Sequence, residues 1–111
     1  MQKLPQIITG NLNVKYVDAV FELLKRITDS RINDANMQLF MTSLCDNDGR
    51  SNDLNDRIKG TKKINEAYNK LSILQQKIVN RTFETAIMNY DTPPLDKYLR
   101  EMELLISKEY K

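Results

Sequence analysis

The sequence contains no histidine and no tryptophan, and it has one cysteine among its 111 residues. Without histidine, the chain lacks the commonest general base, the commonest metal ligand and every serine–histidine or cysteine–histidine nucleophile pair. The single cysteine, Cys45, cannot form a disulfide within the chain, which favours a reducing compartment. These absences exclude most enzyme chemistry, so we expect no catalytic residues, no cofactor site and no metal site.

Glycine and proline are also scarce, with three residues of each. A β-sandwich or barrel needs many tight turns, for which this chain has little material. No apolar run approaches the roughly 18 residues of a membrane span, and the first eight residues lack the apolar segment of a signal peptide. We therefore expect a cytoplasmic protein without membrane association. Asn, Ile and Lys are abundant, which is typical of an AT-rich genome such as those of many low-GC bacteria, phages and plasmids.

The composition is that of an ordinary globular domain, with 41% hydrophobic and 29% charged residues. A chain of 111 residues is long enough for one modest core and too short for two. We expect a single helical domain over residues 1–111. Residues 1–11 are expected to be an irregular N-terminal arm, because Pro5 and Gly10 interrupt any helical period.

Apolar residues recur at steps of three and four along most of the chain, which is the spacing of amphipathic helices. This pattern predicts a helix over residues 14–28, with Val17, Val20 and Leu24 facing inward, and a second helix over 31–44. Residues 46–53 have the polar composition of a loop. A short helical turn over 54–59 is expected to end at Gly60, since glycine is common after the last helical residue.

The longest helical pattern covers residues 62–90, with Thr61 as its N-cap and Pro93 beyond its end. A clean amphipathic pattern then predicts a C-terminal helix over 95–109, whose apolar stripe we interpret as core rather than as a docking face. The sequence therefore predicts an all-α protein, a compact bundle of four to five helices with one long central helix (62–90).

Two carboxylate patterns suggest metal sites, but each lacks some of the carboxylates that such a site needs. Residues 46–49 look like part of a calcium loop, but its first and twelfth positions would be Leu44 and Asn55, which bring no carboxylate. Asp53 and Asp56 are three residues apart, whereas a helical magnesium site needs two such pairs. A solvated turn is the simpler interpretation of the first pattern.

Positive charge is concentrated in residues 57–90, where seven basic side chains stand against two acidic ones. Residues 1–56 carry six basic and eight acidic side chains, and residues 91–111 carry four and five. On one continuous helix, Lys63, Lys70 and Lys77 would share a face, because they are spaced by seven. We predict the basic residues of this region as candidates for binding a partner: Arg57, Lys59, Lys62, Lys63, Lys70, Lys77 and Arg81.

Three interpretations of this basic face stay open: a solvated surface, a docking site for an acidic protein, and a nucleic-acid interface. Among functions we favour a non-catalytic protein that binds another protein as an inhibitor or adaptor, using the basic face together with the acidic loop at 46–56. The alternative is a nucleic-acid-binding accessory protein, although the net charge of +2 is low for a dedicated one. A second copy of the chain is a further candidate partner, because a short bundle can complete its core by dimerising.

Overall fold

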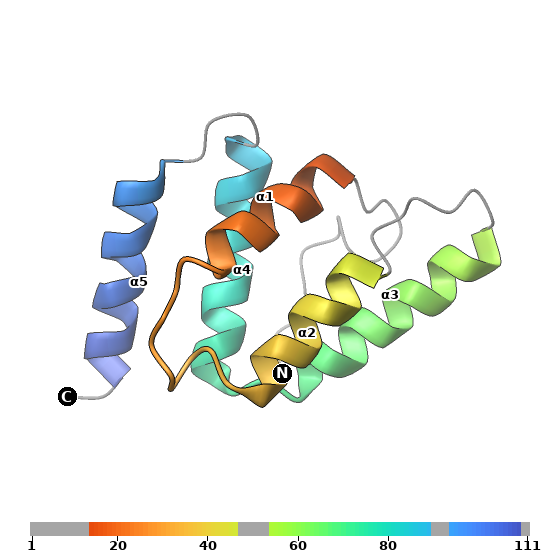
Figure 1. The fold of residues 1–111 in the computed structure, drawn as a ribbon, viewed down its shortest axis with the longest axis horizontal. Helices are drawn as coiled ribbons and strands as arrows, with labels where there is room; N and C mark the ends of the chain where they lie inside the picture. Colours follow the sequence, from red (N-terminus) through yellow and green to blue (C-terminus); the bar gives the residue numbers. More distant parts are fainter. Residues whose placement is uncertain (1–13, 47–53, 90–93, 110–111) are drawn as a thin grey trace.

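The computed structural model describes residues 14–46, 54–89 and 94–109, and all regular secondary structure in these ranges is α-helical. Helix α1 spans Val14–Leu24, α2 spans Ala35–Asp46, α3 spans Leu54–Asn69, α4 spans Ile73–Met88 and α5 spans Leu95–Glu109 (Figure 1). The prediction of an all-α bundle is confirmed. The predicted N-terminal arm at 1–11 lies outside the described residues.

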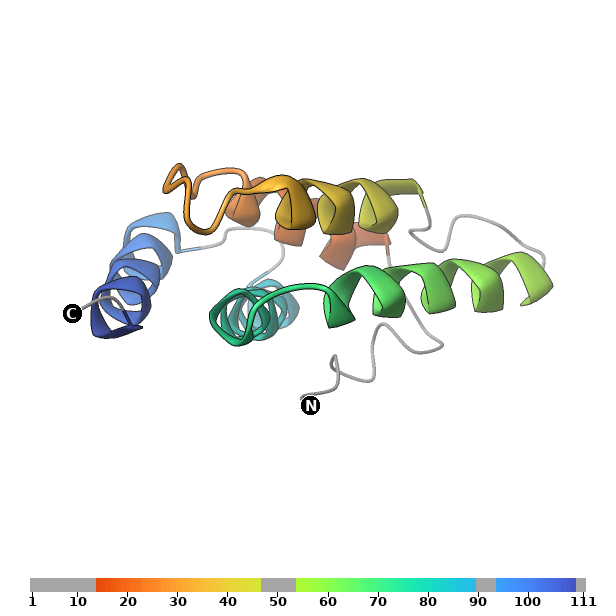
Figure 2. The ribbon, with the colours of Figure 1, turned by 90° about the horizontal axis from the view of Figure 1, so that it is seen from below.

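The helices form two layers, which Figure 2 shows from the edge. Helices α1 and α2 lie in one layer, α3 and α4 lie in the other, and α5 closes one end of the molecule beside α4. Between the layers, α1 packs on α4 and α2 packs on α3, while α5 packs on α4. The shortest dimension of the molecule is 20 Å, which corresponds to two helix diameters of about 10 Å.

The apolar faces that the sequence predicts for α1 and α5 lie in the hydrophobic core, together with buried residues of α2, α3 and α4. Val17, Val20 and Leu24 of α1 are buried, and so are Tyr98 and Met102 of α5. The bounds of α5 agree with the predicted helix over 95–109. Its apolar stripe therefore belongs to the core, as expected.

The first two helices are shorter or shifted relative to their predicted ranges. Helix α1 ends at Leu24 rather than residue 28, and α2 begins at Ala35 rather than residue 31. Asp34 fixes the start of α2, because its Oδ1 accepts a hydrogen bond from the backbone N–H of Met37 at 3.0 Å. The spacing of apolar residues at 31–44 predicts that Leu39 faces inward and that Met37 flanks the apolar stripe. In the structure Met37 is buried and Leu39 is 44% exposed, so this stripe is rotated.

The predicted long central helix over 62–90 is wrong, because two helices occupy this region. Helix α3 starts at Leu54 and continues through Gly60, which is buried on the same face as Ile64 and Ala67. Packing on that face offsets the cost of glycine in a helix, which is about 1 kcal/mol. Gly60 therefore does not end a helix, and Thr61 lies within α3 rather than at its start.

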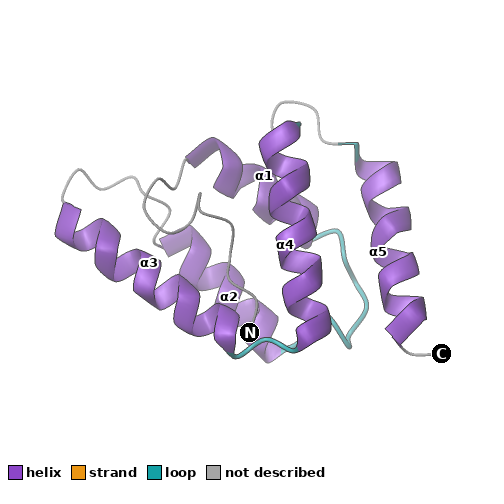
Figure 3. Cartoon of the chain, turned by 180° about the vertical axis from the view of Figure 1, so that it is seen from behind, coloured by secondary structure: helices purple, strands orange, loops and turns teal. Residues whose placement is uncertain are grey.

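The break between α3 and α4 is set by a capping box at Ser72. The Ser72 hydroxyl oxygen accepts from the Gln75 backbone N–H at 3.1 Å, and Gln75 Oε1 accepts from the Ser72 N–H at 2.8 Å. This reciprocal pair satisfies two backbone donors that a helix start would otherwise leave without partners. Figure 3 shows α3 and α4 leaving this joint in different directions.

The side chain of Gln75 also ties this joint to the segment before α2. Its Nε2 donates to the carbonyl oxygen of Ile32 and to Asp34 Oδ1, both at 2.9 Å. Gln75 is 2% exposed, so these bonds form away from solvent. One buried amide thus connects the N-caps of α2 and α4, and it fixes where the two layers meet.

We predict that Gln75→Ala lowers the free energy of unfolding by about 2–3 kcal/mol, because it breaks a capping box and leaves the buried Ile32 carbonyl without its partner. Urea unfolding followed by circular dichroism measures this change. Asn36→Ala removes an exposed amide from α2 and is the matched control, with an expected change below about 0.5 kcal/mol. Equal effects of the two substitutions would contradict the role given to Gln75.

We further predict that acid destabilises the fold, because three carboxylates have lowered pKa values. Hydrogen bonds from Arg31 lower the pKa of Asp29 to about 2, the Met37 N–H lowers the pKa of Asp34, and Arg81 lowers that of Glu101. A carboxylate whose folded pKa is depressed stabilises the fold above its unfolded value of about 3.9–4.3, and this contribution is lost as pH falls through the folded pKa.

The variant Asp34→Asn tests this linkage at one position, because asparagine also caps helices but does not titrate in this range. Urea midpoints measured at neutral pH and at steps below pH about 4 should fall less steeply for the variant than for the original chain. Parallel curves would mean that Asp34 contributes nothing to acid sensitivity.

Candidate functional site

One face of α3 presents basic side chains to solvent. Lys59, Lys62 and Lys63 are exposed together with Glu66, and their spacing of three, one and three residues places them on the same side of the helix. The opposite side of α3 is buried against the core. We name the surface formed by Lys59, Lys62, Lys63 and Glu66 the lysine face.

The three lysines of this face form no ion pair with any other described residue. Glu66 follows Lys62 by four residues and Lys63 by three, so it is the nearest acidic group along the helix to these two lysines. Asp56 precedes Lys59 by three residues, and its side chain lies outside those that the structure describes. Three ammonium groups against these two carboxylates leave a net positive charge on this part of α3. The lysine face can therefore offer its charge to an external acidic group.

The other predicted basic residues are not all brought to this face. Lys70 follows α3 in the joint and Lys77 is exposed on α4, while the side chain of Arg57 lies outside those that the structure describes. Because the helix ends at Asn69 and a new one starts at Ile73, Lys63, Lys70 and Lys77 do not follow one helical line. The continuous basic stripe expected from their spacing of seven is therefore interrupted.

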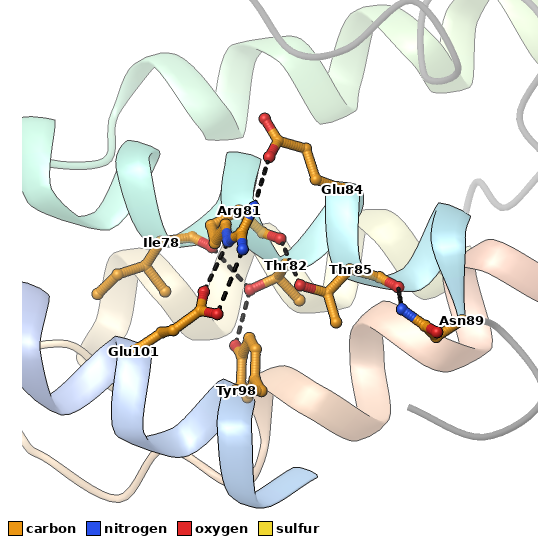
Figure 4. A network of polar contacts seen from close by, with 8 residues as sticks. All are labelled: Ile78, Arg81, Thr82, Glu84, Thr85, Asn89, Tyr98 and Glu101. Atoms are coloured by element: carbon orange, nitrogen blue, oxygen red, sulfur yellow. Dashed lines mark hydrogen bonds and ion pairs between the residues drawn. The ribbon is translucent and has the colours of Figure 1, made fainter. Parts of the chain in front are cut away.

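Arg81, the last of the predicted residues, is bound within the fold (Figure 4). Its Nε donates to Glu101 Oε2 at 2.7 Å and its Nη2 donates to Glu101 Oε1 at 3.2 Å, which makes a two-pronged pair between α4 and α5. Its Nη1 donates to Glu84 Oε2 at 3.0 Å. The hydrogen bonds to Glu101, followed by those to Glu84, raise the pKa of the guanidinium above its usual value.

A second contact between α4 and α5 lies close to this ion pair and is buried. The Thr82 hydroxyl donates to the Ile78 carbonyl at 2.6 Å, so the Tyr98 hydroxyl is the donor in its 2.7 Å bond to Thr82 Oγ1 (Figure 4). Burial raises the pKa of Tyr98 above its usual range. Arg81 and Tyr98 thus fasten α5 to α4, and the positive charge of Arg81 is already met by two carboxylates.

The acidic loop predicted as part of the binding surface is described only at its ends. Asp46 is exposed at the end of α2, residues 47–53 lie outside the described residues, and residues 54–56 begin α3. Among the described residues, no group of three or more acidic or cysteine side chains is placed to hold a metal ion. None of the helices in the described ranges is long and apolar enough to cross a membrane.

Comparisons of this chain with protein-family models, with curated proteins and with solved structures find no match. The candidate site therefore rests on its own geometry. Sequence interpretation missed Ser72 and Gln75, which set the joint between α3 and α4. Their spacing is that of a capping box, S-x-x-Q, and this signal was present in the sequence.

Proposed function

We propose that this chain is a non-catalytic binding protein whose lysine face docks on an acidic surface of another protein, as an inhibitor or adaptor. The observation that carries the proposal is that Lys59, Lys62 and Lys63 are exposed side by side without ion pairs to other described residues. Charges arranged in this way steer a partner of opposite charge toward the surface. The rigid helix beneath them limits the ordering that binding requires.

The groups with lowered pKa values support binding rather than catalysis. Asp29 is engaged by Arg31, Asp34 caps α2, and Glu101 holds Arg81. Each carboxylate is committed to a contact within the fold, and its lowered pKa moves it away from the range of a general acid or base near neutral pH. The absence of histidine from the sequence supports the same conclusion.

A protein partner fits the lysine face better than a nucleic acid does. The three lysines lie within about one helical turn, which spans roughly 5 Å of helix axis. Nucleic-acid binding without base readout depends on many phosphate contacts spread along the backbone. The interruption of the basic stripe at the joint, together with the pairing of Arg81, leaves few cations for such contacts. Binding of DNA or RNA by the basic residues of α3 is therefore the alternative, and the same variants test it.

The setting of this function is proposed on sequence features alone. The lone cysteine supports a reducing compartment such as the cytoplasm, and the coding bias supports origin in a phage or another mobile element. A homodimer is a further proposal, which sedimentation tests directly. A species of 13.0 kDa at all concentrations would argue against it.

We predict that replacing Lys59, Lys62 and Lys63 together by Gln weakens binding to the protein partner about tenfold, since three exposed ion pairs contribute about 0.5 kcal/mol each. The partner is first captured with the tagged original chain from the organism that encodes it, and affinities are then measured by calorimetry. The matched control replaces Lys97, Arg100 and Lys108 of α5, which are also exposed, by Gln, with the same change in net charge.

The proposal requires that only the α3 variant loses affinity for the partner. Equal affinity of both variants would contradict a role for the lysine face, and equal loss would assign the binding to net charge. For the alternative, duplex and single-stranded DNA are titrated at about 50 mM salt, where phosphate contacts are strong. A DNA complex that the α3 variant fails to form would favour a nucleic-acid partner instead.

A further inference from the structure

A pocket of about 370 Å³ opens between α5 and the segment that joins α1 to α2. This volume is at the lower end of the range of about 300–1,000 Å³ that is usual for ligand pockets. Figure 1 shows the joining segment and α5 at one end of the molecule, with α3 at the other end. The pocket is lined by Arg26, Ile27, Thr28, Asp29, Arg31, Leu99, Met102, Glu103, Ile106 and Ser107.

The lining side chains divide into an apolar floor and a polar rim. Ile27, Met102 and Ile106 are buried, and the partly buried Leu99 packs against the same core. The hydroxyl side chains of Thr28 and Ser107 are exposed at the rim. An apolar side chain that entered from solvent would therefore be desolvated where it contacts the apolar floor. Hydrogen-bonding groups would surround it at the rim.

One ion pair at the rim is complete within the fold. Asp29 Oδ1 accepts from the backbone N–H and the Nε of Arg31 at 2.9 and 3.0 Å, and Asp29 Oδ2 accepts from Arg31 Nη2 at 2.7 Å. These three bonds occupy both oxygens of the carboxylate. Asp29 is therefore committed to holding the joining segment in place.

Two opposite charges at the rim remain apart from each other. Arg26 lies on the joining segment and Glu103 lies on α5, so they belong to the two walls of the pocket. Both are exposed, and neither forms an ion pair with a described residue. A ligand that spans the opening can thus meet a cation on one wall and an anion on the other.

We infer that this pocket binds a peptide segment of a partner protein that inserts one large aliphatic side chain between an acidic and a basic neighbour. The aliphatic group rests on Ile27, Met102 and Ile106, the acidic neighbour meets Arg26, and the basic neighbour meets Glu103. This site goes beyond the lysine face, since it lies at the other end of the molecule and uses different residues. Occupation of both sites at once would make the chain an adaptor.

The first test uses the capped tripeptide acetyl-Glu-Leu-Lys-amide as the probe and methyl signals in NMR spectra as the readout. Titration is expected to shift the methyl signals of Ile27, Met102 and Ile106 and to leave those of residues outside the pocket unchanged. Ser107→Trp, which places a ring over the opening, should abolish these shifts. Lys108→Trp, at an exposed neighbour that does not line the pocket, should retain them. Absent shifts, shifts spread over the surface, or equal effects of both variants would overturn the inference.

The second test exchanges the rim charges, which are exposed and can be changed without disturbing the core. The original chain should prefer the Glu-Leu-Lys probe over Lys-Leu-Lys and Glu-Leu-Glu by about two- to fivefold, the range expected for exposed ion pairs. Arg26→Glu should shift the preference to Lys-Leu-Lys, and Glu103→Lys should shift it to Glu-Leu-Glu. Arg100→Glu, on α5 outside the pocket, should leave the preference unchanged. Preferences that do not follow the rim charges would overturn the inference.

The variant with Lys59, Lys62 and Lys63 replaced by Gln separates this site from the lysine face. It should bind the tripeptide as the original chain does, whatever its affinity for the protein partner. Loss of tripeptide binding in this variant would overturn the assignment of the probe to the pocket, while leaving the proposal for the lysine face to its own test.

Discussion

The arrangement of the first four helices depends on the buried side-chain amide of Gln75. Its oxygen accepts from Ser72, and its nitrogen donates to the Ile32 carbonyl and to Asp34, so the hydrogen-bonding groups of the amide are engaged. Ser72 starts α4 and Asp34 starts α2, which means that one side chain joins the two corners of the chain. A buried amide without hydrogen-bond partners would be costly, so the N-terminal ends of α2 and α4 are held in this relative position. No buried side-chain nitrogen or oxygen of the described residues lacks a hydrogen-bond partner.

The position of α5 follows from the position of α4. Helix α5 packs on α4, and the pair is held by the bonds of Arg81 to Glu101 and of Tyr98 to Thr82. Its apolar stripe is only partly covered by this contact, and its other side faces the segment between α1 and α2. The pocket arises where these two parts meet, because a helix and an irregular segment do not interdigitate as two helices do. Helix α3, which carries the lysine face, lies at the other end of the molecule from α5 (Figure 1).

Local periodicity was sufficient to predict the class of the fold and the extent of α5, because burial of one face imposes its spacing on each helix. It misplaced the break in the central region, because Gly60 looks like a helix end and the capping box at Ser72 was overlooked. Glycine is tolerated within α3 because its position is buried, and burial depends on contacts with another helix. The capping box at Ser72 could be predicted from the sequence. The hydrogen bond from Gln75 to Asp34 joins residues 41 positions apart, and local periodicity cannot predict it. The same holds for Arg81, whose partner Glu101 lies on α5, and for the two walls of the pocket.

The division of residues 54–88 into two helices that diverge at Ser72 is tested most directly by a spin-label distance across the joint. Labels at Lys59→Cys and Met88→Cys, after replacement of Cys45 by Ser, would occupy exposed positions on α3 and α4. An unbroken helix would separate these two positions by about 44 Å, at 1.5 Å for each residue. We predict a single narrow distribution well below this length. A distribution centred near about 44 Å would contradict the joint, and with it the positions of the lysine face and the pocket.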